Sequence, residues 1–135
     1  MHVESFGAIG AEVRGVDVVD VDASTFARIY AAWLEHGVLR FRDQSLDDIS
    51  LQDFSRRFGP LEYAPMGLKS EADQEAVTDS YIASISNIVV DDRPIGGLGA
   101  AEANWHTDMS YIQHPPKASV LYAVEVPKSG GDTHF

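Results

Sequence analysis

The chain has 135 residues, 44% of them hydrophobic, which is long enough for one domain with a core and too short for two. Ten Lys and Arg residues against 21 Asp and Glu residues give a net charge of -11. A surface of that sign repels phosphate backbones and anionic lipids, so we expect neither nucleic acid nor a membrane as a partner. Because the chain has no cysteine, a metal site would need nitrogen and oxygen ligands.

The first residues lack the basic and apolar regions of a signal peptide. No stretch approaches the roughly 20 apolar residues that span a bilayer. These two features predict a cytoplasmic protein. The sequence does not decide whether the protein forms a homo-oligomer.

The chain begins with a predicted β-hairpin or meander over residues 3–19, where glycines separate short apolar segments. A helix is predicted next, with Asp22 or Ser24 as its N-cap and Gly37 as its terminator. Apolar residues recur along it at helical spacing: Phe26, Ile29, Tyr30, Trp33 and Leu34.

A short buried strand is predicted over residues 38–41, followed by a turn over residues 43–45. Ser45 or Ser50 is the expected N-cap of a second helix, which ends before Gly59. This helix carries Leu51, Phe54 and Phe58 at helical spacing. The first half of the chain therefore predicts two helices after the opening strands.

The second half is predicted to be mainly strands. A β-branched run over residues 81–90 predicts a strand, and three glycines within residues 91–103 predict a loop. Further strands are expected over residues 105–111 and 118–126. A turn at Gly130 and Gly131 leads to a last strand that begins near Thr133.

A His-x-Asp pair, His106 and Asp108, lies in the first of these predicted strands. Alternate residues of a strand point to the same face, so both side chains could reach one ion. An imidazole nitrogen and a carboxylate oxygen supply two positions of a facial triad, which leaves positions for a chelating cosubstrate and oxygen. An isolated pair of this kind is more often a surface or hydrogen-bonded pair.

The longer pattern resembles the taurine dioxygenase (TauD/TfdA) family. Asn104 and Trp105 directly precede the His-x-Asp pair, two prolines follow at 115–116, and Gly-Gly-Asp-Thr occupies residues 130–133. Residues 36–44 and 57–61 are also similar to that family's N-terminal region, so the resemblance covers nearly the whole chain.

The resemblance implies an α+β, mainly β fold: a partial double-stranded β-helix (jelly roll) with flanking helices, in a single domain over residues 1–135. It also implies an Fe(II)- and 2-oxoglutarate-dependent dioxygenase that uses O2 to hydroxylate a small-molecule substrate, with release of succinate and CO2. His106 and Asp108 would be iron ligands, and the Thr133 hydroxyl would contact a carboxylate of 2-oxoglutarate.

Asn104 and Trp105 are candidates for the substrate side of the pocket, although a tryptophan beside a strand is as often packing. Taurine-specific members carry a sulfonate-contacting histidine where this chain has Ala64, which argues against taurine as the substrate. A sulfonate, sulfate ester or carboxylate substrate is expected instead.

The family's third metal ligand and its arginine for 2-oxoglutarate have no counterpart in this chain. His36 is interpreted as a structural helix-end residue and His114 as a solvated loop residue. His134 alternates with Thr133 and would point away from the cosubstrate. We therefore expect a truncated piece of a longer dioxygenase that is inactive by itself. Two alternatives remain: a non-catalytic β-domain serving binding or assembly, and a cupin-like metal-binding protein.

Overall fold

A computed structural model describes residues 1–64, 81–98 and 104–135. The chain divides into two compact units, which are treated separately below. The first unit combines Met1–Phe54 with Leu121–Phe135, and the second is Ser55–Val120. The single domain inferred from the sequence stays a prediction.

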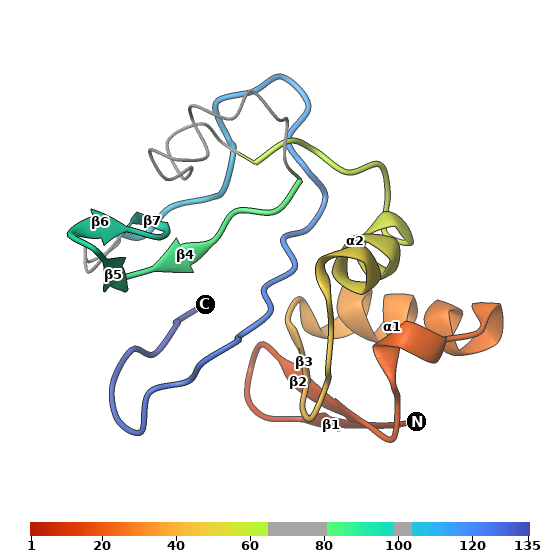
Figure 1. The fold of residues 1–135 in the computed structure, drawn as a ribbon. Helices are drawn as coiled ribbons and strands as arrows, with labels where there is room; N and C mark the ends of the chain where they lie inside the picture. Colours follow the sequence, from red (N-terminus) through yellow and green to blue (C-terminus); the bar gives the residue numbers. More distant parts are fainter. Residues whose placement is uncertain (65–80, 99–103) are drawn as a thin grey trace. The chain divides into compact units, whose positions relative to one another are not determined.

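The first unit contains a three-stranded mixed sheet (Figure 1). β1 (His2–Ser5) and β2 (Ala11–Arg14) form the predicted antiparallel hairpin. β3 (Leu39–Phe41) is the short strand predicted after the first helix, and it pairs with β2 in parallel. The expectation that this strand is buried was wrong, since Arg40 is exposed and Leu39 and Phe41 are only half-buried. Because β2 is the central strand, it carries the most buried residues of the sheet, namely Ala11, Glu12 and Val13.

Helix α1 (Ala23–His36) covers one face of this sheet (Figure 1). Asp22 is its N-cap, and the Asp22 carboxylate accepts a hydrogen bond from the Thr25 amide at 2.6 Å. Gly37 ends the helix with a φ of 73°, which a residue with a Cβ rarely adopts. Both predicted ends are confirmed.

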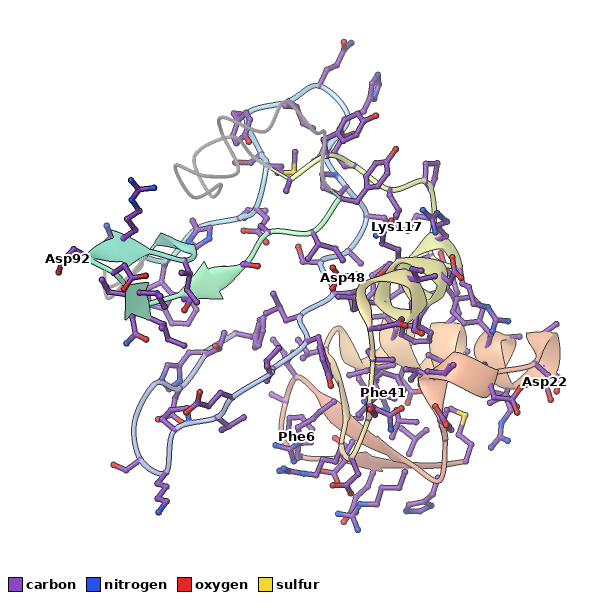
Figure 2. The ribbon with its side chains drawn as sticks, in the orientation of Figure 1. Phe6, Asp22, Phe41, Asp48, Asp92 and Lys117 are labelled. Atoms are coloured by element: carbon purple, nitrogen blue, oxygen red, sulfur yellow. The ribbon has the colours of Figure 1, made fainter. Side chains whose placement is uncertain are left out.

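Helix α2 (Asp48–Arg56) packs through Phe54, which is only 5% exposed. The Phe54 ring meets the Phe41 and Phe26 rings edge-on, at centroid distances of 5.9 and 6.3 Å. Figure 2 shows Phe41 on the helix-covered side of the sheet. The sheet and both helices therefore share one aromatic core.

The expected N-cap of α2 was wrong. Neither Ser45 nor Ser50 caps the helix; the Asp47 carboxylate does, by accepting a hydrogen bond from the Ser50 amide at 2.8 Å. Both serines lie within three residues of Asp47 in the sequence, and all three are good N-cap types. The sequence alone did not separate them.

In the described residues of the second unit there are four strands of two residues each. β4 (Ile85–Ser86) pairs in parallel with β7 (Gly97–Leu98), and β5 (Val89–Val90) pairs antiparallel with β6 (Arg93–Pro94). The single strand predicted over residues 81–90 is therefore two short ones, and part of the predicted loop is also strand. Residues 99–103 of that loop lie outside the described residues.

The hairpin of β5 and β6 turns at Asp91 and Asp92, whose φ values are 50° and 60°. Two consecutive residues with positive φ are the signature of a tight hairpin turn whose twist matches the strands. Aspartate tolerates this conformation better than most residues. The sequence analysis did not foresee this turn.

The strands predicted over residues 105–111, over residues 118–126 and from Thr133 onwards are wrong, since residues 104–135 contain no strand in the structure. A strand requires a partner for its backbone hydrogen bonds, and none of the strands described pairs with these segments. The α+β class is confirmed, whereas the jelly roll stays a prediction. No helix in the described part of the chain is long and apolar enough to cross a membrane.

Candidate metal and cosubstrate site

His106 and Asp108 lie where the chain enters a turn in the second unit. Residues 108–111 form the turn, with Met109 at a φ of 49° and a hydrogen bond from the Ile112 amide to the Met109 carbonyl at 3.2 Å. A residue with a side chain at positive φ interrupts a strand. The turn therefore replaces the expected strand around the pair.

The two side chains nevertheless come together. His106 Nε2 lies 3.2 Å from Asp108 Oδ1, and both side chains are more than half exposed. Two donor atoms bound to one ion at about 2.1 Å and at right angles lie about 3.0 Å apart. The 3.2 Å separation is that of a hydrogen bond or ion pair, and it is also close to the spacing of two adjacent ligands on one divalent metal ion.

A backbone carbonyl orients the imidazole of His106. His106 Nδ1 lies 2.6 Å from the carbonyl oxygen of Asn104, so Nδ1 carries the hydrogen and donates it. In the neutral ring the lone pair is then on Nε2, which faces Asp108. Metal-binding histidines are commonly held in this way. The Asn104 carbonyl, and after it the Asp108 carboxylate, raise the pKa of His106 above its ordinary 6.5.

Ser119 is a third member of this cluster that sequence reasoning missed. Its hydroxyl donates a hydrogen bond to Asp108 Oδ2 at 2.8 Å, from eleven residues along the chain. No sequence motif identifies this serine, because its contact with Asp108 depends on the path of the intervening residues, which include the turn and two prolines. Among the described residues, no group of three His, Asp or Glu side chains lies close enough to hold a metal ion.

The other predicted site residues lie as follows. Asn104 contributes its carbonyl to the cluster, whereas the Trp105 side chain is 80% exposed and is not packed in a core. Thr133 lies exposed in the C-terminal segment of the first unit, just after Gly130 and Gly131. Both glycines have positive φ, of 75° and 73°, but the chain bends at residues 128–129, directly before them, and no turn is assigned at the glycines themselves. The roles of all three residues stay predictions.

A cluster of charges that the sequence analysis did not foresee lies on the sheet of the first unit. The buried Glu12 carboxylate accepts hydrogen bonds from Arg14 and Arg40, each at 2.6 Å, and from Arg42 at 3.1 Å. Arg14, then Arg40 and Arg42, lower the Glu12 pKa to about 2. These side chains line a surface hollow of about 550 Å³. Because they join β2 to β3, we interpret the cluster as structural.

A spacing of two residues, Glu12 with Arg14 and Arg40 with Arg42, was the available signal for this cluster. Such pairs share one face of a strand. Cross-strand pairing then places Arg40 directly beside Glu12. Strand order, which the sequence does not state, was the missing information.

Comparison with known proteins shows which family and which characterised enzymes the chain is similar to. Residues 2–135 match the family model described as "Taurine catabolism dioxygenase TauD, TfdA family". The chain is 36% identical over 132 residues to an alpha-ketoglutarate-dependent sulfate ester dioxygenase of Pseudomonas putida, covering 94% of this chain and 38% of that protein.

Two further relatives have different printed activities. A (S)-phenoxypropionate/alpha-ketoglutarate-dioxygenase of Sphingobium herbicidovorans is 34% identical, covering 93% of this chain and 41% of its own length. Pentalenolactone F synthase of Streptomyces avermitilis is 38% identical, covering 92% and 40%. The chain thus spans about two fifths of the length of these relatives. By its match to the family model over almost every residue, the chain belongs to the TauD/TfdA family, whose dioxygenases use Fe(II), 2-oxoglutarate and O2.

Proposed function

We propose that the protein carrying this chain is an Fe(II)- and 2-oxoglutarate-dependent dioxygenase, and that His106 and Asp108 are two of its metal ligands. The observation that carries the proposal is the 3.2 Å separation of His106 Nε2 and Asp108 Oδ1, which fits two cis positions on one ion. The reaction converts a substrate C–H bond, 2-oxoglutarate and O2 into the hydroxylated product, succinate and CO2.

Each residue has a distinct part in this proposal. When bound, the iron and 2-oxoglutarate supply the oxygen chemistry, and the protein supplies orientation and exclusion of water. His106 donates its Nε2 lone pair while the Asn104 carbonyl holds Nδ1–H. Asp108 supplies one negative charge, and Thr133 supplies a hydroxyl donor for a cosubstrate carboxylate. Asn104 and Trp105 are proposed to border the substrate.

The proposed substrate is a small organic molecule that carries an anionic group, with a sulfate ester or an aryloxy carboxylate as the first choices. The relatives named for a sulfate ester and for phenoxypropionate support this class. Ala64, which is 9% exposed, offers no hydrogen-bonding side chain where taurine-specific members are expected to carry a histidine. Taurine is therefore not the proposed substrate.

The proposal also concerns the part of the fold around the site. We propose that the chain forms the N-terminal part of one jelly-roll domain, and that a second histidine and an arginine for 2-oxoglutarate come from outside the described residues. The coverage of only 38 to 41% of two dioxygenase relatives supports this view. A bidentate arginine is the usual partner of such a carboxylate.

The test uses the complete reading frame that encodes this chain. His106→Ala and Asp108→Ala should each lose Fe(II) from the purified protein and lose succinate formation, because each removes one of few protein ligands. His2→Ala removes an exposed histidine from β1 and is the matched control. Iron content and turnover equal to the parent's in both site variants would disprove the ligand assignment.

A second measurement separates the proposal from the alternatives. The parent protein should release succinate with Fe(II), 2-oxoglutarate and O2, and release should increase with the right substrate from a panel of sulfate esters, sulfonates and aryloxy acids. A cupin-like protein would bind zinc or manganese and consume no oxygen. A non-catalytic binding module would bind no metal ion and release no succinate.

A further inference from the structure

The two oxygens of the Asp108 carboxylate have different partners. Oδ1 faces His106 Nε2 at 3.2 Å, and Oδ2 accepts the Ser119 hydroxyl at 2.8 Å. A hydroxyl donor at 2.8 Å is an ordinary strong contact to a carboxylate. Oδ1 therefore faces His106 and the proposed metal position, while Oδ2 is held by the Ser119 hydroxyl.

We propose that Ser119 is a positioning residue that makes Asp108 a one-oxygen metal ligand, through Oδ1. This inference rests on the proposed function. A carboxylate that binds through both oxygens takes two positions on an ion, and one that binds through a single oxygen takes one. A facial triad needs its remaining positions for the cosubstrate and oxygen. By holding Oδ2, the Ser119 hydroxyl keeps a position open.

The local backbone explains how Ser119 reaches Asp108. The turn at residues 108–111 reverses the chain, and the prolines at 115–116 restrict the returning segment. Ser119 and Asp108 belong to the same compact unit, Ser55–Val120. Two constraints therefore fix the direction of the carboxylate: the turn on its own backbone and the serine hydroxyl on its outer oxygen.

A purely structural role for Ser119 predicts something different. If the hydrogen bond only closed the loop between residues 108 and 119, its removal would lower stability and leave the bound metal's coordination unchanged. If it positions the ligand, its removal changes the metal's affinity and its spectrum. Partners of metal ligands typically contribute a factor of about 10 to 100 in metal affinity.

The experiment uses the complete reading frame, loaded with Mn(II) for affinity and with Co(II) for its absorption spectrum. Ser119→Ala should weaken Mn(II) binding about tenfold or more and shift the Co(II) spectrum. Ser119→Thr keeps a hydroxyl at this exposed position, so its Mn(II) affinity and Co(II) spectrum should match those of the parent. Ser110→Ala removes a hydroxyl from the same turn and should change neither. Thermal unfolding of each apoprotein reports any loss of structure.

The outcomes separate this inference from the function on which it rests. If His106→Ala and Asp108→Ala lose the metal while Ser119→Ala binds Mn(II) like the parent, the Ser119 role is wrong and the proposed function stands. If Asp108→Ala itself retains the metal, both fail. Weakened binding in Ser119→Ala that Ser119→Thr does not restore, with a lowered unfolding temperature, would also overturn the positioning role.

Discussion

Replacing Phe54 by alanine tests how the helices are fixed to the sheet. Phe54 is 5% exposed and is the one buried residue of α2. Its ring lies edge-on to Phe41 of β3 and Phe26 of α1. Truncating a buried phenylalanine costs about 3 to 5 kcal/mol, of which two aromatic pairs account for about 1 to 3 kcal/mol. We expect Phe54→Ala to lower the free energy of unfolding by about 3 to 5 kcal/mol.

Urea unfolding monitored by tryptophan fluorescence measures this loss. Ile49→Ala is the matched control, because Ile49 lies on the same helix with 69% of its surface exposed. Exposed substitutions usually stay within about 0.5 kcal/mol. If Phe54→Ala loses no more stability than Ile49→Ala, α2 does not pack on the sheet as described. Phe54→Leu, which refills much of the volume, should fall between the two.

Two further predictions concern a carboxylate and a hydroxyl. Arg14 and two further arginines lower the Glu12 pKa from 4.5 to about 2. The stabilisation by Glu12 is therefore complete above pH 4.5 and lost as the pH falls through 2. The urea midpoints of Glu12→Gln and the parent should differ at pH 7 and converge towards pH 2; a constant difference would contradict this. Thr133→Val should weaken 2-oxoglutarate binding in calorimetry and leave Fe(II) binding unchanged, and an unchanged 2-oxoglutarate affinity would remove Thr133 from the site.

Helix α1 was predictable because its signals are local and agree with one another. Asp22 lies directly before the helix, apolar residues recur through Leu34, and Gly37 directly follows it. Each signal acts within a few residues, so no tertiary information is needed. The N-cap of α2 was predicted wrongly because local signals compete there: several residues that make good N-caps are neighbours in the sequence.

The segments near the site were harder to predict because strands depend on distant partners. Residues 105–111 and 118–126 have the composition of strands, yet a strand forms only where a second chain segment supplies hydrogen bonds. His106 and Asp108 lie close together as expected, but the turn at residues 108–111 takes the place of the strand from which that expectation was argued. The contact from Ser119 was not predicted, because it depends on the path of the intervening loop.

The hydroxyl of Tyr122 connects the two chain segments that make up the first unit, Met1–Phe54 and Leu121–Phe135. It accepts a hydrogen bond from the Leu46 amide at 3.3 Å and donates one to the Gln44 carbonyl at 3.4 Å. Leu46 and Tyr122 are 76 residues apart. At about 5 to 20 residues per second, a ribosome makes Tyr122 roughly 4 to 15 s after Leu46. Throughout that interval the nascent chain lacks both hydrogen bonds, so a chaperone at the tunnel exit meets the first unit before its final segment has been made.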